Sequence, residues 1–384
     1  MIVGIDASSL RAGGGITHLS NLLEVASPEP YGITRVVVWG GRDTLDRLPA
    51  RTWLVPAHER LLDGNLASRL SWQLVRLPWL ATRQCDLLFA PGGTSMAPIH
   101  PRVVMSRNML PFDVRERRRF GVSWTRARLG LLKRSQSRSF RSADGVIFLT
   151  EYAQREVCAQ LRTPPHQVAI VPHGVDERFR CAPRPQRRLA TYDHSHPFRL
   201  LYVSIVTSYK HQWVVAEAVA ALRQAGLPVA IDFVGPNGDP RAVQQLSDAV
   251  RRLDPAGAFL NVSGPCAYRD LPARYQAADA FVFASSCENM PNILIEAMAS
   301  GLPIACSNRG PMPEVLGPGG VPFDPEDAAD VEASLRRLLN DPDVRASVAT
   351  HAYERSKAFT WERCARDTFA FLARVEAHHR RGRA

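Results

Sequence analysis

The stretch FASSCENMPNILIEAMASGLPIACSNRGPMPEVL, residues 283–316, decides the fold of this chain. A short β-type run, Ala280 to Ala284, is followed by polar residues, a proline and an amphipathic helical pattern that closes at Gly301. Pro291 suits the first helical position, where its missing N–H costs nothing, and Gly301 suits the position just past the helix. The pattern predicts a strand–loop–helix unit of a parallel α/β sheet.

The start of this helix is a predicted anion site. The amides of Asn292, Ile293 and Leu294 would be unpaired first-turn donors at the positive end of the helix, which suits a diphosphate. Glu288 precedes the helix and Glu296 lies one turn inside it. A carboxylate beside a diphosphate is favourable only if it binds hydroxyls, so both are predicted to recognise a sugar. The alternative is an ordinary crossover in which both glutamates are merely solvated.

The segment resembles the donor site of glycosyltransferase family 4, also called glycosyltransferases group 1, and the similarity continues through residues 301–305 and 313–315. The resemblance implies that Glu296 holds the ribose hydroxyls of the nucleotide and that Glu288 contacts the transferred hexose. The amides that follow Pro291 would meet the phosphates. The family also implies an α/β chain with the GT-B fold, in which two Rossmann-like, doubly wound parallel-sheet domains face an interdomain cleft.

Length and composition agree with a two-domain globular protein. The chain has 384 residues, of which 45% are hydrophobic and 22% are charged. No apolar run reaches 18 residues, and the start MIVGIDASSL is not typical of a signal peptide, so we expect a cytoplasmic protein. Seven scattered cysteines without C-x-x-C pairs favour reduced thiols and argue against a zinc site. No cluster has metal-ligand spacing, so we expect no metal and no cofactor.

Short apolar runs alternate with helical patterns throughout, which is typical of parallel sheets covered on both faces. The expected strands are residues 1–5, 35–39, 86–90, 103–106, 145–150, 168–172, 199–204, 229–235, 259–263, 280–284, 303–307 and 321–323. We expect an acceptor-binding domain over residues 1–180, a linker over 181–197 and a nucleotide-sugar-binding domain over 198–360. Residues 361–384 should form a C-terminal helix that, as in relatives, crosses back to the first domain, with a frayed tail.

The stretch LYVSIVTSYKHQ, residues 201–212, resembles the family's phosphate-binding turn. Lys210 matches the lysine that neutralises the donor diphosphate, although a surface lysine in a loop is the alternative. Many relatives carry an arginine five residues earlier, where this chain has Ile205. Either donor binding is weaker, or nearby hydroxyls replace the cation; the available ones belong to Ser204, Thr207 and Ser208.

Three stretches of the first domain are predicted to face the substrates. Gly14 and Gly15 belong to a triple glycine that begins at Gly13 and matches the family's loop over the donor phosphates. Residues 105–113 resemble the loop at the floor of the acceptor cleft, where Arg107 and Asn108 stand in place of the usual histidine. An amide or guanidinium will not act as a general base near neutral pH. Asn108 could instead bond its own backbone. The third stretch, Pro91 to Thr94, contains the acceptor-side Gly92 and Gly93.

Two further segments match family motifs. Gly264, Pro265 and Cys266 precede a helix where relatives contact the nucleobase through backbone groups. Residues 173–176, HGVD, match an interdomain motif in which asparagine is usual, and we interpret them as a hinge turn. His18 and His211 are expected to be ordinary surface residues.

The formal net charge is +11, and it is unevenly distributed. From Arg115 to Arg141 the chain has ten Arg or Lys residues and one acid, Glu116, with interleaved apolar residues. Such a segment suits an anionic membrane surface or a polyanionic acceptor. The alternative is a solvated helical face that also contributes to the core. Nucleic-acid binding is not expected, because no nucleic-acid-binding signature accompanies the charge.

The resemblance implies a retaining, metal-independent hexosyltransferase. It would move a hexose such as mannose from a UDP- or GDP-linked sugar to a glycan or lipid-linked acceptor. The basic segment suggests bacterial surface polysaccharide or lipopolysaccharide synthesis, with the protein peripheral on the inner face of the plasma membrane. Lys210, Glu288 and Asn108 are the predicted catalytic residues. The alternatives are a non-catalytic GT-B subunit and an epimerase or hydrolase of nucleotide sugars.

Overall fold

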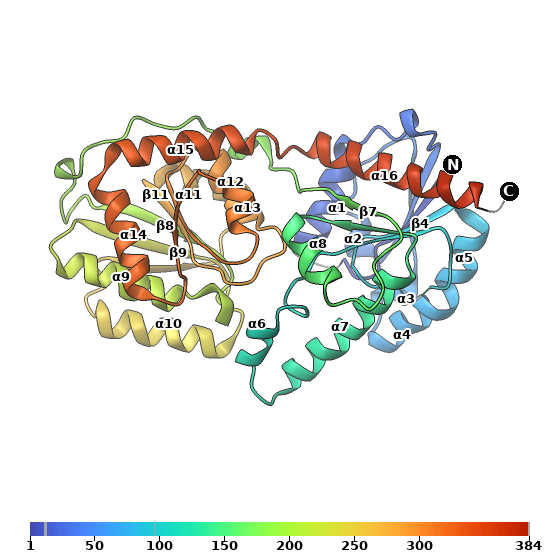
Figure 1. Ribbon diagram of the computed structural model, residues 1–384, viewed down its shortest axis with the longest axis horizontal. Coiled ribbons are helices and arrows are strands. Elements are labelled where there is room, and N and C mark those ends of the chain that lie inside the picture. The colour runs from blue at the N-terminus through green and yellow to red at the C-terminus, as the bar shows by residue number, and fades with distance from the viewer. Residues whose placement is uncertain (11–13, 96, 383–384) are drawn as a thin grey trace. The chain divides into compact units, whose positions relative to one another are not determined.

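A computed structural model describes residues 1–10, 14–95 and 97–382, and it divides into two compact units (Figure 1). The first unit holds residues 1–174 together with the C-terminal segment from Thr360, and the second holds residues 175–359. The chain therefore enters the second unit before residue 180. The expected linker, residues 181–197, belongs to the second unit because its backbone and side chains are bonded there. Arg184 donates to the carbonyls of Gln276, at 2.8 Å, and Ala278.

In the described residues the first unit contains a seven-stranded sheet, in which every neighbouring pair is parallel. The strand order is β3-β2-β1-β4-β5-β6-β7. The strands are β1 (Ile2–Asp6), β2 (Arg35–Gly40), β3 (Leu54–His58), β4 (Leu87–Ala90), β5 (Arg102–Met105), β6 (Gly145–Phe148) and β7 (Val168–Ile170). Except for β3 they coincide with the predicted apolar runs. Apart from the edge strand β7, these runs are largely buried because helices cover the sheet.

Strand β3 is absent from the strands expected from the sequence. This strand contains Pro56, which has no N–H for a sheet ladder and argues against a central strand. The structure places β3 at the edge of the sheet, next to β2 alone, where a proline is tolerated.

None of the helices that the structure describes is long and apolar enough to cross a bilayer.

The helices of the first unit are α1 (Gly14–Val25), α2 (Arg42–Leu45), α3 (Arg60–Asp63), α4 (Leu66–Ser71), α5 (Leu77–Gln84), α6 (Val114–Arg119), α7 (Trp124–Ser142), α8 (Glu151–Cys158) and α16 (Trp361–Arg381). Short helices η1 (Glu29–Tyr31) and η2 (Trp72–Arg76) complete the unit, and η2 is a π-helix.

Helix α16 is part of the first unit, where it packs on α1, β4 and β6. Phe371 and Val375 lie directly over Gly145 at the start of β6, so closely that a side chain at residue 145 would collide with both. The helix continues to Arg381, so the frayed tail expected from residue 378 was wrong for its first four residues. Burial of the apolar face of α16 against the sheet explains why the helix persists.

The second unit has a parallel six-stranded sheet with the order β10-β9-β8-β11-β12-β13 in the described residues. The strands are β8 (Phe198–Val203), β9 (Val229–Val234), β10 (Leu260–Gly264), β11 (Ala280–Phe283), β12 (Ile304–Ser307) and β13 (Val321–Phe323). Numbered within the unit, this is the order 3-2-1-4-5-6 of a Rossmann fold. The predicted fold class, two Rossmann-like parallel-sheet domains, is confirmed.

The helices of the second unit follow its strands. They are α9 (Gln212–Gln224), α10 (Pro240–Leu253), α11 (Leu271–Ala277), α12 (Asn292–Ala299), α13 (Met312–Leu316), α14 (Ala328–Asn340) and α15 (Pro342–Ser356), with the short helices η3 (Glu177–Phe179), η4 (Leu189–Thr191), η5 (Ser208–Lys210) and η6 (Tyr268–Asp270). In such a sheet ligands bind where the strand order reverses, at the carboxyl ends of the strands. Here that point lies between β8 and β11.

Candidate functional site

Lys210 and Glu288 meet where the strand order of the second sheet reverses, between β8 and β11, which we call its switch point. Lys210 ends η5, which follows β8, and Glu288 lies in the loop between β11 and α12. Their side chains form an ion pair between Nζ and Oε1. The Ser285 hydroxyl donates to the same carboxylate oxygen at 2.6 Å. Neither residue is merely solvated, because each compensates the other's charge.

Lys210 is buried, which is unusual for a lysine. Only 4% of the residue is exposed, and its ammonium group lies 4.8 Å from the centre of the Phe283 ring. The Tyr202 hydroxyl donates to the Lys210 carbonyl and accepts the Ala284 amide at 3.2 Å. Tyr202 therefore ties the lysine turn to the end of β11. A point charge held this way has little freedom to move away from Glu288.

His211 is buried, so its expected surface position was wrong. It is 1% exposed, and its φ of 49° lies in the left-handed region that residues with a side chain rarely adopt. Its Nε2 lies 2.9 Å from the Ser286 hydroxyl of the loop after β11. The Ser286 amide in turn donates to the Tyr209 carbonyl at 2.9 Å. The two loops that carry Lys210 and Glu288 are thus joined by a second set of bonds.

The start of α12 differs in detail from the prediction. Pro291 is the N-cap, in an extended conformation, and the helix begins at Asn292. The Leu294 amide is not an open donor, because it donates to the Pro291 carbonyl at 3.1 Å. Asn292 and Ile293 occupy the first two helical positions, where amides have no acceptor within the helix. Gly301 follows the helix with a φ of 65°, as predicted for the residue past its end.

Glu296 has a different environment from Glu288. It is 6% exposed and accepts a hydrogen bond from the Tyr275 hydroxyl at 3.2 Å. Burial raises the pKa of Glu296 to about 7, although hydrogen bonds from Tyr275 and Tyr268 oppose the shift. Tyr268 lies just after Pro265 and Cys266, so the structure brings that loop to Glu296. The two tyrosines were missed, since nothing in the sequence pairs them with a glutamate.

One hydroxyl near the lysine turn has no partner among the residues that the structure describes. Ser204 donates to the Ile205 carbonyl at 3.0 Å, and Ser208 donates to Asp239. The Thr207 hydroxyl, by contrast, is buried without a hydrogen bond. Ile205, which stands where many relatives have an arginine, is 41% exposed.

The glycine turn of the first unit is braced by Arg107. Gly13 lies outside the described residues, and α1 begins at Gly14. Arg107 donates to the carbonyls of Gly14, at 2.7 Å, and Gly15, at 3.3 Å. Burial lowers the pKa of Arg107 to about 10. The guanidinium group predicted to face an acceptor is therefore used within the protein. Asn108 is exposed, and its side-chain oxygen accepts the Leu110 amide at 3.1 Å, which is the backbone-bonding alternative.

Gly92 and Gly93 follow β4, at the point where the strand order of the first sheet reverses. Gly92 lies so close to the Ser9 hydroxyl that a Cβ there would collide with it. Gly93 has a φ of 80°. The structure thus brings the loops after β1 and β4 together, as expected for two neighbouring strands.

His18 is also buried, against expectation, in contact with His173. Their Nδ1 atoms lie 2.8 Å apart, so one ring donates and the other accepts, and both are neutral. Trp361 packs on both rings, with centroids 5.5 and 6.2 Å away. Burial, followed by the charge of Arg107, holds the pKa of each histidine well below its usual value. Residue 173 therefore anchors α1 and α16 rather than serving only as a hinge.

Residues 192–355 match the family described as glycosyl transferases group 1. The matched residues make up most of the second unit. The recognition of this family from residues 283–316 is confirmed.

Solved structures of this family's fold resemble the whole chain. Sucrose-phosphate synthase from Thermosynechococcus elongatus has a TM-score of 0.74 at 17% identity, over 98% of this chain and 100% of the other. Anabaena HepE in complex with UDP and glucose has a TM-score of 0.70 at 18% identity, over 97% and 99%. At such identities the likeness establishes the GT-B fold.

A curated relative, O-antigen chain mannosyltransferase B of Escherichia coli, is 36% identical over 99 residues, or 26% of each chain. The chain spans about a quarter of the length of that relative and about half the length of two D-inositol 3-phosphate glycosyltransferases that it also matches.

The buried histidine pair should make the first unit sensitive to acid. Both rings are neutral in the folded state, because their pKa values are held well below the usual value. In the unfolded chain each histidine takes up a proton below a pKa of about 6.5. The free energy of unfolding therefore decreases as the pH is lowered through about 6.5. From about pH 7.5 to about pH 5.5 we expect a loss of about 1.4 kcal/mol per histidine. Urea unfolding at both pH values checks this. His173→Asn should remove about half of the loss, and an unchanged pH dependence would contradict the assignment.

Proposed function

We propose that the protein is a retaining, metal-independent hexosyltransferase that uses a nucleoside-diphosphate sugar. The observation that carries the proposal is the buried pair of Lys210 and Glu288 at the switch point of the second sheet, beside the start of α12. A fixed cation, a helix N-terminus and a hydroxyl-binding carboxylate are what a sugar diphosphate requires.

In this proposal the diphosphate binds between Lys210 and the first turn of α12. The ammonium group has three N–H donors, of which Glu288 needs one, so the others can reach phosphate oxygens. The amides of Asn292 and Ile293 supply further donors. The Thr207 hydroxyl, which is buried without a partner among the described residues, is the natural substitute for the arginine that Ile205 replaces.

The two carboxylates would divide the recognition of the sugars. Glu288 pairs with Lys210 through Oε1, and its second oxygen can accept hydrogen bonds from hexose hydroxyls. Glu296 lies one turn further along α12 and would accept the ribose hydroxyls. The loop of Pro265 and Cys266 reaches Glu296 through Tyr268, which supports a nucleobase contact at that loop.

For the reaction itself, Lys210 and the α12 dipole would stabilise the negative charge that develops on the leaving diphosphate. The leaving diphosphate itself can take the proton of the acceptor hydroxyl on the donor face, which gives retention at the anomeric carbon. Asn108 cannot act as a base, and its oxygen already binds the Leu110 amide, so its proposed role is limited to hydrogen bonding an acceptor through its amide N–H groups. The acceptor side of the site would be shaped by Arg107, Gly14, Gly15, Gly92 and Gly93.

Relatives support the choice of substrates. HepE was solved with UDP and glucose, and the Escherichia coli relative is described as an O-antigen chain mannosyltransferase. We therefore propose a UDP- or GDP-linked hexose, with mannose as a candidate, and a glycan or lipid-linked acceptor of bacterial surface polysaccharide or lipopolysaccharide synthesis.

Nucleotide binding tests the donor site directly. One of UDP, GDP and ADP should raise the melting temperature of the wild type in a thermal-shift assay, and Glu296→Ala should abolish the shift because the ribose contact is lost. Glu354→Ala, which removes an exposed glutamate of α15, is the control and should bind normally. No shift with any nucleotide would favour a non-catalytic subunit instead.

Removing either member of the buried pair should slow transfer. We expect Lys210→Ala and Glu288→Ala each to lower kcat on the order of 10²-fold, as for other groups that stabilise charge in a transition state. Lys357→Ala breaks an exposed pair and should change kcat little. Product analysis belongs to the same experiment, since free sugar or an epimerised nucleotide would indicate a hydrolase or an epimerase. Full activity in both variants of the buried pair would contradict the mechanism.

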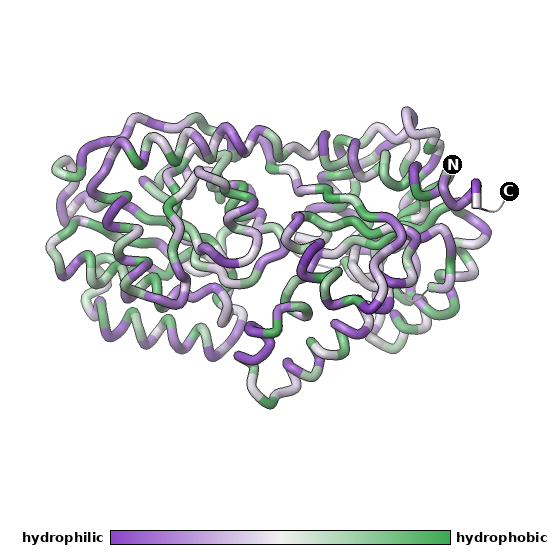
Figure 2. The backbone as a smooth tube through the Cα atoms, in the orientation of Figure 1, coloured by the Kyte–Doolittle hydropathy of each residue, from purple (hydrophilic) through white to green (hydrophobic). Residues whose placement is uncertain are grey.

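The basic segment 115–141 forms two helices, α6 and α7, joined by a turn that projects from the first unit (Figure 1). Hydrophobic and hydrophilic residues alternate along it (Figure 2). Val122 is fully exposed, Trp124 is 77% exposed, and Leu131 is exposed as well. Leu129 and Phe140 are buried, so the segment also contributes to the core, as the alternative held. We propose that its exposed tip docks on an anionic membrane, at the inner face of the plasma membrane.

Vesicle co-sedimentation checks this docking. The wild type should bind vesicles that contain an anionic lipid, less so as salt rises, because the arginines are screened. Trp124→Ser should weaken binding roughly tenfold, since the indole anchors the tip at the interface. Trp79→Ser, at a tryptophan of α5 that is also exposed, is the matched control. Binding that ignores salt, or equal loss in both variants, would contradict the proposal.

A further inference from the structure

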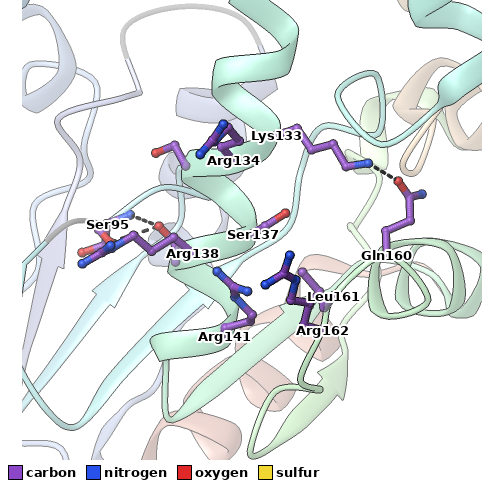
Figure 3. Close-up of a pocket in the computed structure, with 11 residues that line it drawn as sticks. Ser95, Lys133, Arg134, Ser137, Arg138, Arg141, Gln160, Leu161 and Arg162 are labelled. Atoms are coloured by element: carbon purple, nitrogen blue, oxygen red, sulfur yellow. Dashed lines mark hydrogen bonds between the residues drawn. The ribbon is translucent and has the colours of Figure 1, made fainter.

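A basic groove lies between α7 and the segment that follows α8, entirely within the first unit (Figure 3). It has a volume of about 670 Å³. We define the basic groove by its cations and hydroxyls, which are Lys133, Arg134, Arg138, Arg141, Arg162, Ser95, Ser135, Ser137 and Ser139. Leu161 is the apolar residue of its lining and Gln160 the amide, and no acidic side chain lines it among the described residues.

The arginines of the basic groove are uncompensated. Among the residues that the structure describes, none of the four forms an ion pair, whereas exposed arginines elsewhere do, such as Arg251 with Asp248. The guanidinium groups of Arg141 and Arg162 lie next to one another although they come from different elements (Figure 3). Like charges held together are unfavourable unless an anion is shared between them.

The lining of the basic groove contains a polar group that needs a partner. Ser95 is 3% exposed, and the Ser139 hydroxyl fixes its backbone by accepting the amide and donating to the carbonyl, both at 3.0 Å. The Ser95 hydroxyl is buried without a hydrogen bond among the described residues. A buried hydroxyl without an acceptor is costly, so this site favours a ligand oxygen.

Lys133 closes the groove on the side of α8. Its ammonium group donates to the Gln160 side chain at 2.6 Å, which fixes the charge against the segment that carries Arg162. Because the lining has one apolar residue, it suits a charged group and not a hydrocarbon chain.

We propose that the basic groove is a second ligand site, which binds a molecule that carries two or more phosphate groups. Guanidinium forks bind phosphate oxygens in pairs, and several cations within one groove match the dense negative charge of a diphosphate better than that of a single carboxylate. The phosphates can belong to the headgroup of a membrane lipid or to a soluble phosphorylated saccharide. The inference is independent of the donor site, because all groove residues lie in the first unit.

Pyrophosphate is the probe for the test, measured by calorimetric titration of the full chain. The double variant Arg141→Gln/Arg162→Gln should weaken binding at least about tenfold, because two charge-assisted contacts are lost. Arg126→Gln/Arg128→Gln removes the same charge from α7 outside the basic groove and should weaken binding less than about threefold. Equal weakening in the two variants would show general charge attraction and overturn the proposal.

Because pyrophosphate also resembles part of a sugar nucleotide, the titration is repeated with Lys210→Ala. Binding that persists in this variant and disappears in the groove variant supports the second site, whatever the outcome at the donor site. Binding that Lys210→Ala abolishes would overturn the proposal. Circular dichroism of each variant controls for folding.

Vesicles distinguish the two sources of phosphate. Phosphatidylcholine vesicles with and without phosphatidylinositol bisphosphate, whose headgroup carries several phosphates, are sedimented with the wild type and the groove variant. If the groove variant loses the binding that depends on the bisphosphate lipid, the site holds a lipid headgroup. If it loses pyrophosphate binding but still sediments, the ligand is a soluble phosphorylated molecule. Both results support the site, and wild-type protein that binds neither pyrophosphate nor the bisphosphate vesicles would refute it.

Discussion

The buried ion pair between Lys210 and Glu288 is the interaction on which the second unit's site depends. Taking two charges out of water is costly, and the cost is offset only when the geometry is good and the remaining donors and acceptors are bonded. Here the Ser285 hydroxyl donates a hydrogen bond to the Glu288 carboxylate, and the Tyr202 hydroxyl donates to the Lys210 carbonyl. Removing one partner would leave the other buried and uncompensated, so both loops must keep their conformation together.

The left-handed backbone at His211 is part of the same constraint. A residue with a side chain in this region is strained, and the strain persists only where its surroundings hold it. The contact of His211 with Ser286 lies between the two loops that carry the ion pair. A glycine would relieve the strain but would lose this bond, which explains why a histidine occupies the turn.

The two glutamates of the second unit show how environment separates similar groups. Glu288 is paired with the cation of Lys210, whereas burial raises the pKa of Glu296 to about 7, against the opposing hydrogen bonds from two tyrosines. A carboxyl group that titrates near neutrality gains most from a ligand that donates hydrogen bonds to its charged form. The first unit has a different electrostatic character, since none of the four arginines that line its basic groove forms an ion pair with a residue that the structure describes.

By itself the sequence determined both parallel sheets, because continuous apolar runs between helical patterns can be buried only in that way. It also placed Lys210, Glu288 and Glu296 correctly on the loops and helix that follow β8 and β11. It missed β3, whose Pro56 is compatible only with an edge position, and an edge is defined by pairing with distant strands.

Only the tertiary structure decided which side chains meet. His211 contacts Ser286 across 75 residues of sequence, and His18 contacts His173 across 155, so neither burial was visible in local pattern. The same holds for Glu296 and Tyr275, and for the arginines of α7 and Arg162. Local sequence sets backbone conformation and one buried face, whereas partners far apart in the chain are chosen by the packing of whole elements.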